Sequence, residues 1–323
     1  MNQQNQSLIT IGVTAYNAEN TIATAIRSAA GQTWSNIEII CVDDCSSDHT
    51  LEMLADLEKT NSNLRVYQND HNGGVAVTRN RIIREAKGEF IVFFDDDDES
   101  APERLTRQYQ RIVDYERDYA QGQPVICHTA RRQHYPGGAD RYAPTLGTTL
   151  GTVAPHGVAV AERILLGRPL KNGYGSMATC SQMARRSVYQ NLGLFDESLR
   201  RSEDTDLNIR LALAGGHFVG IAEPLVTQTM TLTNEKHLAE ERSYTLQYIA
   251  KHKAFLDRTG SYDFCHRWID AKFDLLERKK VKFLTKLIKL FLCFPIATLK
   301  RLVGSLPGVR SNLQFSEFYN SRR

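Results

Sequence analysis

The sequence predicts an α/β protein, with a mostly parallel, doubly wound sheet flanked by helices and a helical C-terminal extension. Two observations lead to this fold class. Short apolar segments rich in β-branched residues alternate with helical segments through the first 119 residues. The connecting loops are short and polar, so they should meet at one edge of the sheet, where α/β proteins bind ligands.

The elements of this first half follow from local signals. Gly31 can end a helix that begins at Thr21, and Ser46–Asp48 supply N-cap chemistry for a helix through Glu58. Gly73-Gly74 form a turn into the next helix. The predicted strands cover 8–16, 37–42, 64–68 and 89–94, and the predicted helices cover 21–30, 48–58, 75–86 and 103–119.

The fourth strand runs straight into an acidic segment. Five apolar residues, Phe90–Phe94, precede five acids, Asp95–Glu99, and Pro102 suits the start of the next helix. Carboxylates this close repel one another by about 1 kcal/mol per pair even in water. A divalent cation with oxygen ligands would offset that repulsion and bind a phosphate. The alternative is a solvated acidic loop.

The second half gives weaker signals. Residues 134–175 are rich in Gly, Pro and Tyr without periodicity, which predicts long loops around the site. Residues 176–185 are predicted as a strand. The acids of 202–206 open a helix over 207–214 that Gly215-Gly216 can end, and residues 236–303 are predicted to be largely helical.

Composition bounds the class of protein. The chain has 323 residues, 41% hydrophobic, enough for two domains. The polar segment Met1–Gln6 predicts no signal peptide, and six cysteines without metal-ligand spacing predict a reducing, cytoplasmic location. The net charge of +3 is uneven, because residues 278–323 hold eleven Lys and Arg against one acid. An acidic body with a basic tail indicates two functions in one chain.

Five motifs in order resemble those of the family 2 glycosyltransferases of the GT-A fold, over about residues 7–230. Each motif alone is common, but the ordered set is specific. The resemblance implies a catalytic domain over 1–235, with a nucleotide-binding half (1–100) and an acceptor half (101–235), and a basic helical extension over 236–323. The motifs are Thr14–Asn17, Val42–Asp48, Asn72–Gly74 with Arg79-Asn80, Asp95–Asp98 and Glu203-Asp204.

By this resemblance, the first motifs bind a UDP-sugar. Tyr16 would stack on the uracil ring and Asp44 would accept its ring N–H, since a pyrimidine imide offers one face and one donor. Cys45 stands where the family has glycine, which questions the shape of this loop. The alternative is that Tyr16 is a core residue and Asp43-Asp44 caps a helix. The other residues expected at the nucleotide are Thr14, Asp43, Arg79, Asp95 and Asp96.

The resemblance also assigns a metal and a base. Asp97, with Asp95, would ligate Mn²⁺ or Mg²⁺ on the diphosphate, although four successive aspartates leave the register open by one residue. Asp204, beside Glu203, would be the general base of a single displacement that inverts the anomeric carbon. The alternative for both acids is stabilisation of a helix N-terminus, worth about 0.3–1 kcal/mol each. Metal ligation by His237 is disfavoured.

The segment 278–292 places lysines among bulky apolar residues. Its apolar run is shorter than the ~20 residues that a membrane span needs. It suits a helix in the membrane interface, attracted to anionic lipid. The alternative is a helix packed on the catalytic domain, while nucleic-acid binding is disfavoured because few aromatic residues lie among the charges.

The leading hypothesis is therefore an inverting, metal-dependent transfer of sugar from a UDP-sugar to a saccharide, with a lipid-linked acceptor at the membrane, as in surface polysaccharide assembly. A sugar nucleotidyltransferase is the first rival, although Ala15–Asn20 lacks its glycine-rich basic loop. A catalytically inactive sugar-nucleotide-binding scaffold is the second. A dehydrogenase is disfavoured because no Gly-x-Gly-x-x-Gly follows the first strand. The sugar, the acceptor linkage and the oligomeric state are left open.

Overall fold

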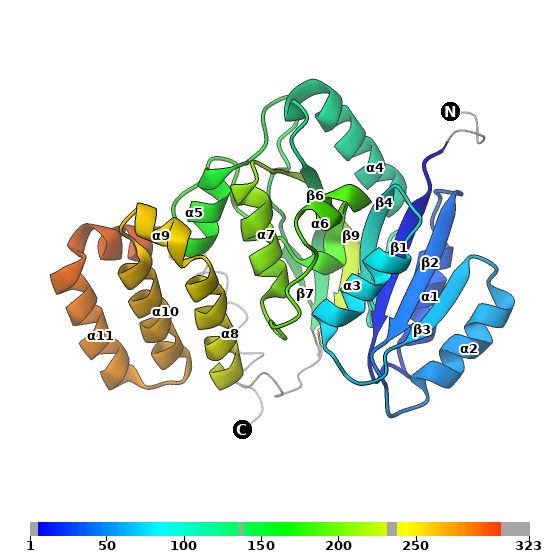
Figure 1. The fold of residues 1–323 in the computed structure, drawn as a ribbon, viewed down its shortest axis with the longest axis horizontal. Coiled ribbons are helices and arrows are strands. Elements are labelled where there is room, and N and C mark those ends of the chain that lie inside the picture. Colours follow the sequence, from blue (N-terminus) through cyan, green and yellow to red (C-terminus); the bar gives the residue numbers. More distant parts are fainter. Residues whose placement is uncertain (1–5, 136–137, 231–237, 305–323) are drawn as a thin grey trace. The chain divides into compact units, whose positions relative to one another are not determined.

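The computed structural model describes residues 6–135, 138–230 and 238–304, and it confirms the α/β class with a mostly parallel sheet flanked by helices (Figure 1). The chain divides into two compact units. Unit 1 comprises residues 1–158 and 171–230, and unit 2 comprises residues 159–170 and 231–323.

The parallel part of the sheet in unit 1 is built from the four predicted strands. Strand order is β3-β2-β1-β4, continued by β8-β6-β9-β5, with β7 paired to β6. The first four strands are mutually parallel, β8 is antiparallel to β4 and β6, and β9 is parallel to β6. The strands are β1 (Ile9–Ala15), β2 (Ile37–Asp43), β3 (Leu64–Gln68), β4 (Phe90–Asp95), β5 (Asp98–Ser100), β6 (Val125–Tyr135), β7 (Ala139–Ala143), β8 (Gln182–Arg185) and β9 (His217–Thr229).

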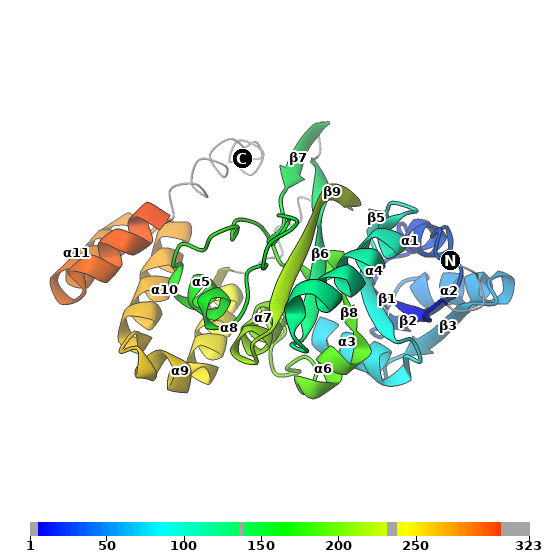
Figure 2. The ribbon, with the colours of Figure 1, turned by 90° about the horizontal axis from the view of Figure 1, so that it is seen from above.

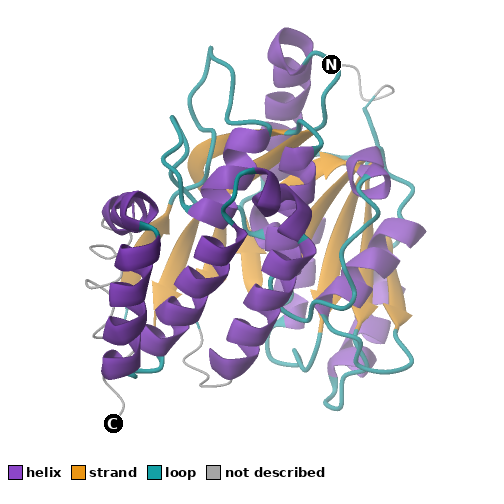
Figure 3. Cartoon of the chain, turned by 60° about the vertical axis from the view of Figure 1, so that its left-hand side comes forward, coloured by secondary structure: helices purple, strands orange, loops and turns teal. Residues whose placement is uncertain are grey.

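Helices cover both faces of this sheet (Figure 3). In Figure 1, α3, α6 and α7 lie in front of the strands and α1 lies behind them, and the view from above in Figure 2 agrees. Helix α1 buries Ile22, Ala25, Ile26 and Ala29, the spacing of one helical face, against the core formed by β1 and β4. The helices of unit 1 are α1 (Ile22–Ala30), α2 (Thr50–Thr60), α3 (Val75–Glu85), α4 (Arg104–Tyr115), α6 (Arg186–Asn191) and α7 (Glu203–Leu213).

The middle of the chain, residues 134–185, departs from the sequence-based expectation. The stretch 134–175, expected as loops, contains β7 and the helix α5 (Val158–Leu166). The expected strand over 176–185 is a 3₁₀ turn, Thr179–Ser181, followed by the shorter β8. Strand β7 forms because its backbone pairs antiparallel with the end of β6, from Tyr135 with Ala139 to Arg131 with Ala143.

Unit 2 is helical, as predicted for the described part of 236–303. Helix α10 lies between α8 and α11 (Figure 1), and its Phe264 and Ala271 form a small core with Leu290 of α11. Across the described residues, none of the helices combines the length and apolar character needed to span a bilayer. The helices are α8 (Leu238–Lys251), α9 (Lys253–Arg258), α10 (Tyr262–Leu276) and α11 (Lys280–Cys293), followed by helical residues 295–304.

Candidate active site

The predicted motifs meet where the strand order reverses. Strand β1 has β2 on one side and β4 on the other, so the chain runs from β1 to β2 and β3 in one direction and then crosses back to β4 in the other. Such a switch point leaves a crevice beyond the strand ends, where open α/β sheets bind ligands. Thr14 near the end of β1 is in register with Asp95 at the end of β4. The two predicted motifs therefore lie next to each other at this switch point.

Tyr16 lies against the acidic run. Its backbone N–H donates to Asp96 Oδ2 at 2.8 Å, while its side chain is about half exposed, which excludes the core alternative for this ring. Burial, together with the charges of Asp97 and Asp95, raises the pKa of Asp96 to about 7. The exposed Tyr16 ring thus follows directly on a backbone contact with Asp96, a carboxylate close to other acids.

Asp43 and Asp44 are buried and hold the neighbouring loops. Asp44 accepts hydrogen bonds from the backbone of Gly73 (3.1 Å) and Gly74 (2.7 Å) and from the Asn69 side chain (2.8 Å). Asp43 accepts from the backbone N–H of Ser46 at 3.0 Å. A carboxylate has about four acceptor sites, so Asp44 retains capacity for one more donor. Contact of either residue with a nucleotide stays a prediction.

The loop around Cys45 keeps the backbone shape that a glycine would give. Cys45 has φ 61°, in the left-handed region that side chains disfavour. Gly74, at the N-terminus of α3, has φ 87° and also needs this freedom. Cysteine in place of glycine at position 45 therefore adds strain to the loop but leaves its backbone conformation the same.

The acidic run is split between a buried and an exposed side. Asp98 is 5% exposed and accepts from Gln228 Nε2 at 3.2 Å, while the Asp97 side chain faces solvent. Burial, then the charges of Asp95 and Asp97, raise the pKa of Asp98 to about 8. Burial, then the charge of Asp95, raise the pKa of Asp97. The run holds more negative charge than its surroundings compensate.

These carboxylates suit a hard divalent cation. Asp95, Asp98 and Cys180 have ligand atoms that all lie within 4.8 Å of one another. Burial and the charge of Asp95 raise the pKa of the Cys180 thiol, so it stays neutral and the oxygens are the effective donors. Carboxylate oxygens are the ligands that Mg²⁺ and Mn²⁺ prefer. The carboxylates fit the expected metal, and the group brought together among the described residues contains Asp95 and Asp98 but not Asp97, whose role as a ligand stays a prediction.

Sequence reasoning missed the residues that support this run from the far strands. Arg131 on β6 donates to Gln228 Oε1 at 2.6 Å and to Ser176 Oγ at 2.7 Å. Gln228 on β9 in turn donates to Asp98. Beneath the run, the fully buried Arg104 donates to the Phe93 carbonyl at 3.0 Å and to Ser100 Oγ at 2.8 Å. No local pattern signals these roles, because they depend on which strands become neighbours.

Arg79 joins the acidic run to the second acidic motif. Its guanidinium, 6% exposed, donates to Glu203 Oε1 at 2.6 Å and lies 3.5 Å from Asp95 Oδ1. The rings of Phe93 and Phe195 flank it at 5.9 and 5.5 Å. Burial raises the pKa of Glu203, and Arg79 acts in the opposite direction. Arg79, predicted beside a nucleotide, is thus the ion that links β4 to α7.

Glu203 and Asp204 form the first turn of α7. Ser202 before them has φ 66°, and the half-buried Asp204 accepts from the backbone N–H of Thr205 at 2.6 Å. Acidic side chains in the first turn are favourable for a helix, because its N-terminus carries partial positive charge. The loop before α7 is held by Asn80 of α3, which makes two hydrogen bonds with the Phe195 backbone, at 2.8 and 2.9 Å. The arrangement brings the second acidic motif to the same region as the first.

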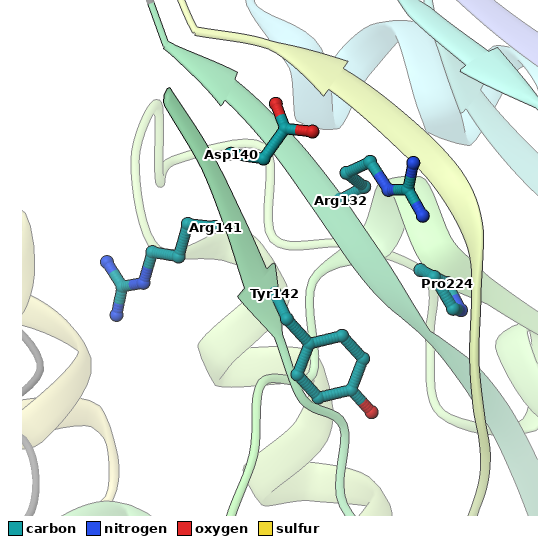
Figure 4. A pocket seen from close by; sticks show the side chains of 5 residues that line it. All are labelled: Arg132, Asp140, Arg141, Tyr142 and Pro224. Atoms are coloured by element: carbon teal, nitrogen blue, oxygen red, sulfur yellow. The ribbon is translucent and has the colours of Figure 1, made fainter. Parts of the chain in front are cut away.

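A separate pocket of about 410 Å³ lies along the β6–β7 hairpin (Figure 4). None of the predicted site residues lines it, and Arg132 points to the opposite face of β6 from Arg131. The predicted minor candidate His237 lies outside the described residues. The pocket's lining residues are Arg132, Asp140, Arg141, Tyr142 and Pro224.

The fold and this region define an α/β protein whose switch point carries an exposed aromatic ring, a run of carboxylates and the N-terminus of a helix. Residues 10–192 match the model of "Glycosyl transferase family 2". This match covers more than half of the chain, and the chain belongs to that family. The resemblance seen in the motifs is confirmed.

Curated relatives agree with this membership. The chain is 30% identical over 258 residues to the amylovoran biosynthesis glycosyltransferase AmsB of Erwinia amylovora, covering 78% of this chain and 80% of AmsB. It is 32% identical over 107 residues to the putative teichuronic acid biosynthesis glycosyltransferase TuaG of Bacillus subtilis. It is 36% identical over 106 residues to WfgD of Escherichia coli, named as a UDP-Glc:α-D-GlcNAc-diphosphoundecaprenol β-1,3-glucosyltransferase. The last two matches cover 33% of this chain and only 42% and 41% of those relatives.

Solved structures share the fold. Staphylococcus aureus TarS (residues 1–349) in complex with UDP-GlcNAc aligns with a TM-score of 0.56 at 19% identity, covering 92% of this chain and 88% of that one. The mannosyltransferase PcManGT of Pyrobaculum calidifontis, in complex with GDP-Man and Mn²⁺, aligns with a TM-score of 0.54 at 15% identity, covering 99% and 84%. At these identities the likeness establishes the GT-A fold.

Proposed function

We propose that this chain is a metal-dependent, inverting hexosyltransferase that moves a sugar from a UDP-sugar to a saccharide hydroxyl in bacterial surface polysaccharide assembly. One observation carries the proposal: Arg79 holds Asp95 of the first acidic motif and Glu203 of the second within one set of contacts. A donor bound at the acidic run would thus present its sugar toward Asp204.

In the proposed reaction, Asp204 takes the proton of the acceptor hydroxyl. That oxygen attacks the anomeric carbon as the bond between this carbon and the diphosphate oxygen breaks, and UDP leaves. A divalent cation held by Asp97 and Asp95 would neutralise the charge that develops on the diphosphate. The Tyr16 ring would stack on the uracil, with Thr14, Asp43, Asp44 and Asp96 around the nucleotide.

The relatives support the donor and the pathway class. TarS is solved with UDP-GlcNAc and PcManGT with Mn²⁺, which makes a nucleotide-sugar donor and a metal reasonable for this chain. AmsB and TuaG are named for polysaccharide biosynthesis, and WfgD for a diphosphoundecaprenol-linked acceptor. We therefore include a lipid-linked saccharide acceptor and action at the cytoplasmic membrane surface in the proposal.

A panel of nucleotide sugars, scored for UDP release with and without Mn²⁺ and an acceptor, tests the reaction. Asp204→Asn should keep UDP binding and lose about 10²–10⁴-fold in turnover, the range for general-base catalysis. Normal turnover by this variant would refute the base. Release of pyrophosphate would favour the nucleotidyltransferase, and binding without release would favour the scaffold.

Calorimetry of UDP binding tests the metal. Asp97→Asn should abolish the part of UDP affinity that depends on Mn²⁺. Glu99→Gln is the matched control, because Glu99 is an exposed acid of the same segment outside the proposed ligands. Unchanged metal-dependent affinity in Asp97→Asn would remove Asp97 from the ligand set.

A further inference from the structure

Helix α11 is packed in unit 2 with a charged residue inward. Lys286 Nζ lies 2.5 Å from Asp270 Oδ2 and 2.5 Å from Asp274 Oδ2, both on α10. Leu290, one turn further along, is buried against the same helix, in the small core with Phe264 and Ala271. Two ion pairs and one apolar contact on the same side of α11 therefore fix its rotation about its own axis.

The opposite side of α11 is apolar and exposed. Val281 and Leu292 are each 79% exposed, and Leu284 and Ile288 between them more than half. Spacings of three and four residues place these side chains in one row along the helix. Beyond the helix break at Phe294, Ile296 and Leu299 are also exposed. We call Val281, Leu284, Ile288 and Leu292 the apolar row. An exposed patch of this kind marks an interaction surface.

Lysines lie along both flanks of the apolar row. At 100° per residue, Lys282 and Lys289 lie on one flank and Lys280 on the other, and all three are exposed. The segment 278–323 as a whole holds eleven Lys and Arg and a single acid. Two copies meeting through this face would bring lysines against lysines. A surface that is apolar below and anionic above complements both the row and its flanks.

We propose that the apolar row is a docking face for anionic lipid bilayers. The row would lie at the boundary between headgroups and acyl chains, with Lys280, Lys282 and Lys289 at the lipid phosphates. The proposal deepens the proposed function, on which it rests only for the lipid-linked acceptor, because docking would bring that acceptor to the enzyme. Docking itself needs neither donor nor acceptor.

Sedimentation of the full chain with vesicles tests the face without any substrate. Phosphatidylglycerol–phosphatidylcholine vesicles should carry the protein down, and pure phosphatidylcholine vesicles should carry much less. The double variant Ile288→Glu/Leu292→Glu should stay in the supernatant. Leu150→Glu in unit 1, at a residue 71% exposed, is the matched control and should sediment as the unaltered chain does.

A second variant keeps the test decisive if the first fails to fold. Lys282→Gln/Lys289→Gln should bind anionic vesicles roughly 30-fold more weakly, which is about 1 kcal/mol for each lysine near the surface. Circular dichroism and thermal melting check that each variant is folded. Vesicle binding that is unchanged in both folded variants would overturn the proposal.

Two further outcomes would also overturn it. The first is recovery of the unaltered chain only in the supernatant. The second is a dimer in ultracentrifugation that Ile288→Glu/Leu292→Glu dissociates while vesicles bind nothing, which would make the face a contact between copies. UDP release with a soluble acceptor is measured separately and should be equal in all folded variants. Loss of transfer in every protein, with vesicle binding intact, would reject the proposed function and leave the docking face standing.

Discussion

The edge of the sheet at the switch point of unit 1 and the α10–α11 pair of unit 2 differ in how their charged side chains are paired. At the edge, burial raises the pKa values of Asp96 and Asp98 to about 7 and about 8, and Arg79 is shared between two acids. In unit 2, hydrogen bonds from Lys286, then from Arg242, lower the pKa of Asp274 against its burial. The charges between α10 and α11 are thus paired with one another, whereas the acids at the edge of the sheet are held close to like charges.

The largest loss of stability is expected when Arg79 is replaced. Arg79→Met should lower the free energy of unfolding by about 3–5 kcal/mol, because Glu203 is left as an unpaired buried charge. Urea denaturation measures it. Arg84→Met is the matched control: its partner Glu197 is largely solvated, and the loss should be at most about 1 kcal/mol.

A double variant separates a lost ion pair from lost packing against the phenylalanine rings. Arg79→Met/Glu203→Leu should regain most of the stability lost in Arg79→Met, because no buried charge is left without its partner. A double variant as unstable as the single one would mean that packing, and not charge, explains the effect.

Acid should weaken unit 1 through His217. Tyr115 Oη accepts from the Ala154 N–H at 2.9 Å and lies 2.7 Å from His217 Nδ1, and it donates to that nitrogen when the imidazole is neutral with its proton on Nε2. Burial, then the charge of His156, lower the pKa of His217 to about 4. Since the unfolded chain takes up this proton first, the stabilisation is complete above about pH 6.5 and is lost between there and pH 4, by about 2–3 kcal/mol in total.

Denaturation at pH 7, 5 and 4, compared with His217→Gln, measures this contribution. The difference in stability between the two proteins should shrink as the pH falls. A constant difference would contradict the assignment. The ion pairs of Asp274 should survive this range, because hydrogen bonds from Lys286 and then Arg242 hold the pKa of this carboxyl below its ordinary value.

A smaller effect is expected in unit 2. Lys286→Met should cost about 1–2 kcal/mol, since Lys286 is one-third exposed and Asp274 keeps Arg242 as a second partner at 3.1 Å. Lys282→Met, at an exposed position of the same helix, is the control. A loss as large as that of Arg79→Met would remove the contrast between the two regions.

The smallest effect is expected at Cys45. Cys45→Gly should raise the free energy of unfolding by up to about 1 kcal/mol, because glycine relieves the left-handed conformation at φ 61°. Cys45→Ala keeps a Cβ atom and should bring no gain. Equal stability of the two variants would show that this loop carries no strain.

The first half of the fold could be predicted from sequence because its signals are local. The predicted strand over 64–68 coincides with β3, and those over 8–16 and 89–94 match β1 and β4 within one residue. The strands β6 and β9 gave no such signal. Val125–Tyr135 carries several charged and polar residues, and His217–Thr229 contains Gly220 and Pro224, so only their mutual pairing makes them strands.

The candidate site divides in the same way. Its acidic motifs could be found because carboxylates follow strand ends or open a helix, features that are visible within a few residues. The support from Gln228 and Arg131 could not, because it depends on a bulge between Thr129 and Arg131 that sets the register of β6 on β9. The pairing of Arg79 with Glu203, 124 positions apart, is equally invisible to local patterns.

Helix α3 is held by hydrogen bonds at two points along its length. At the first turn of α3, Asp44 accepts a hydrogen bond from the Gly74 amide. One and a half turns later, Arg79 donates to Glu203 of α7 and Asn80 donates to Phe195 in the loop before α7. A single-residue insertion between these points would rotate Arg79 by 100° about the helix axis and away from Glu203, while the hydrogen bond to Asp44 would remain. The length of α3 between Gly74 and Arg79 is therefore a spacer that evolution could not lengthen without uncoupling the two acidic motifs.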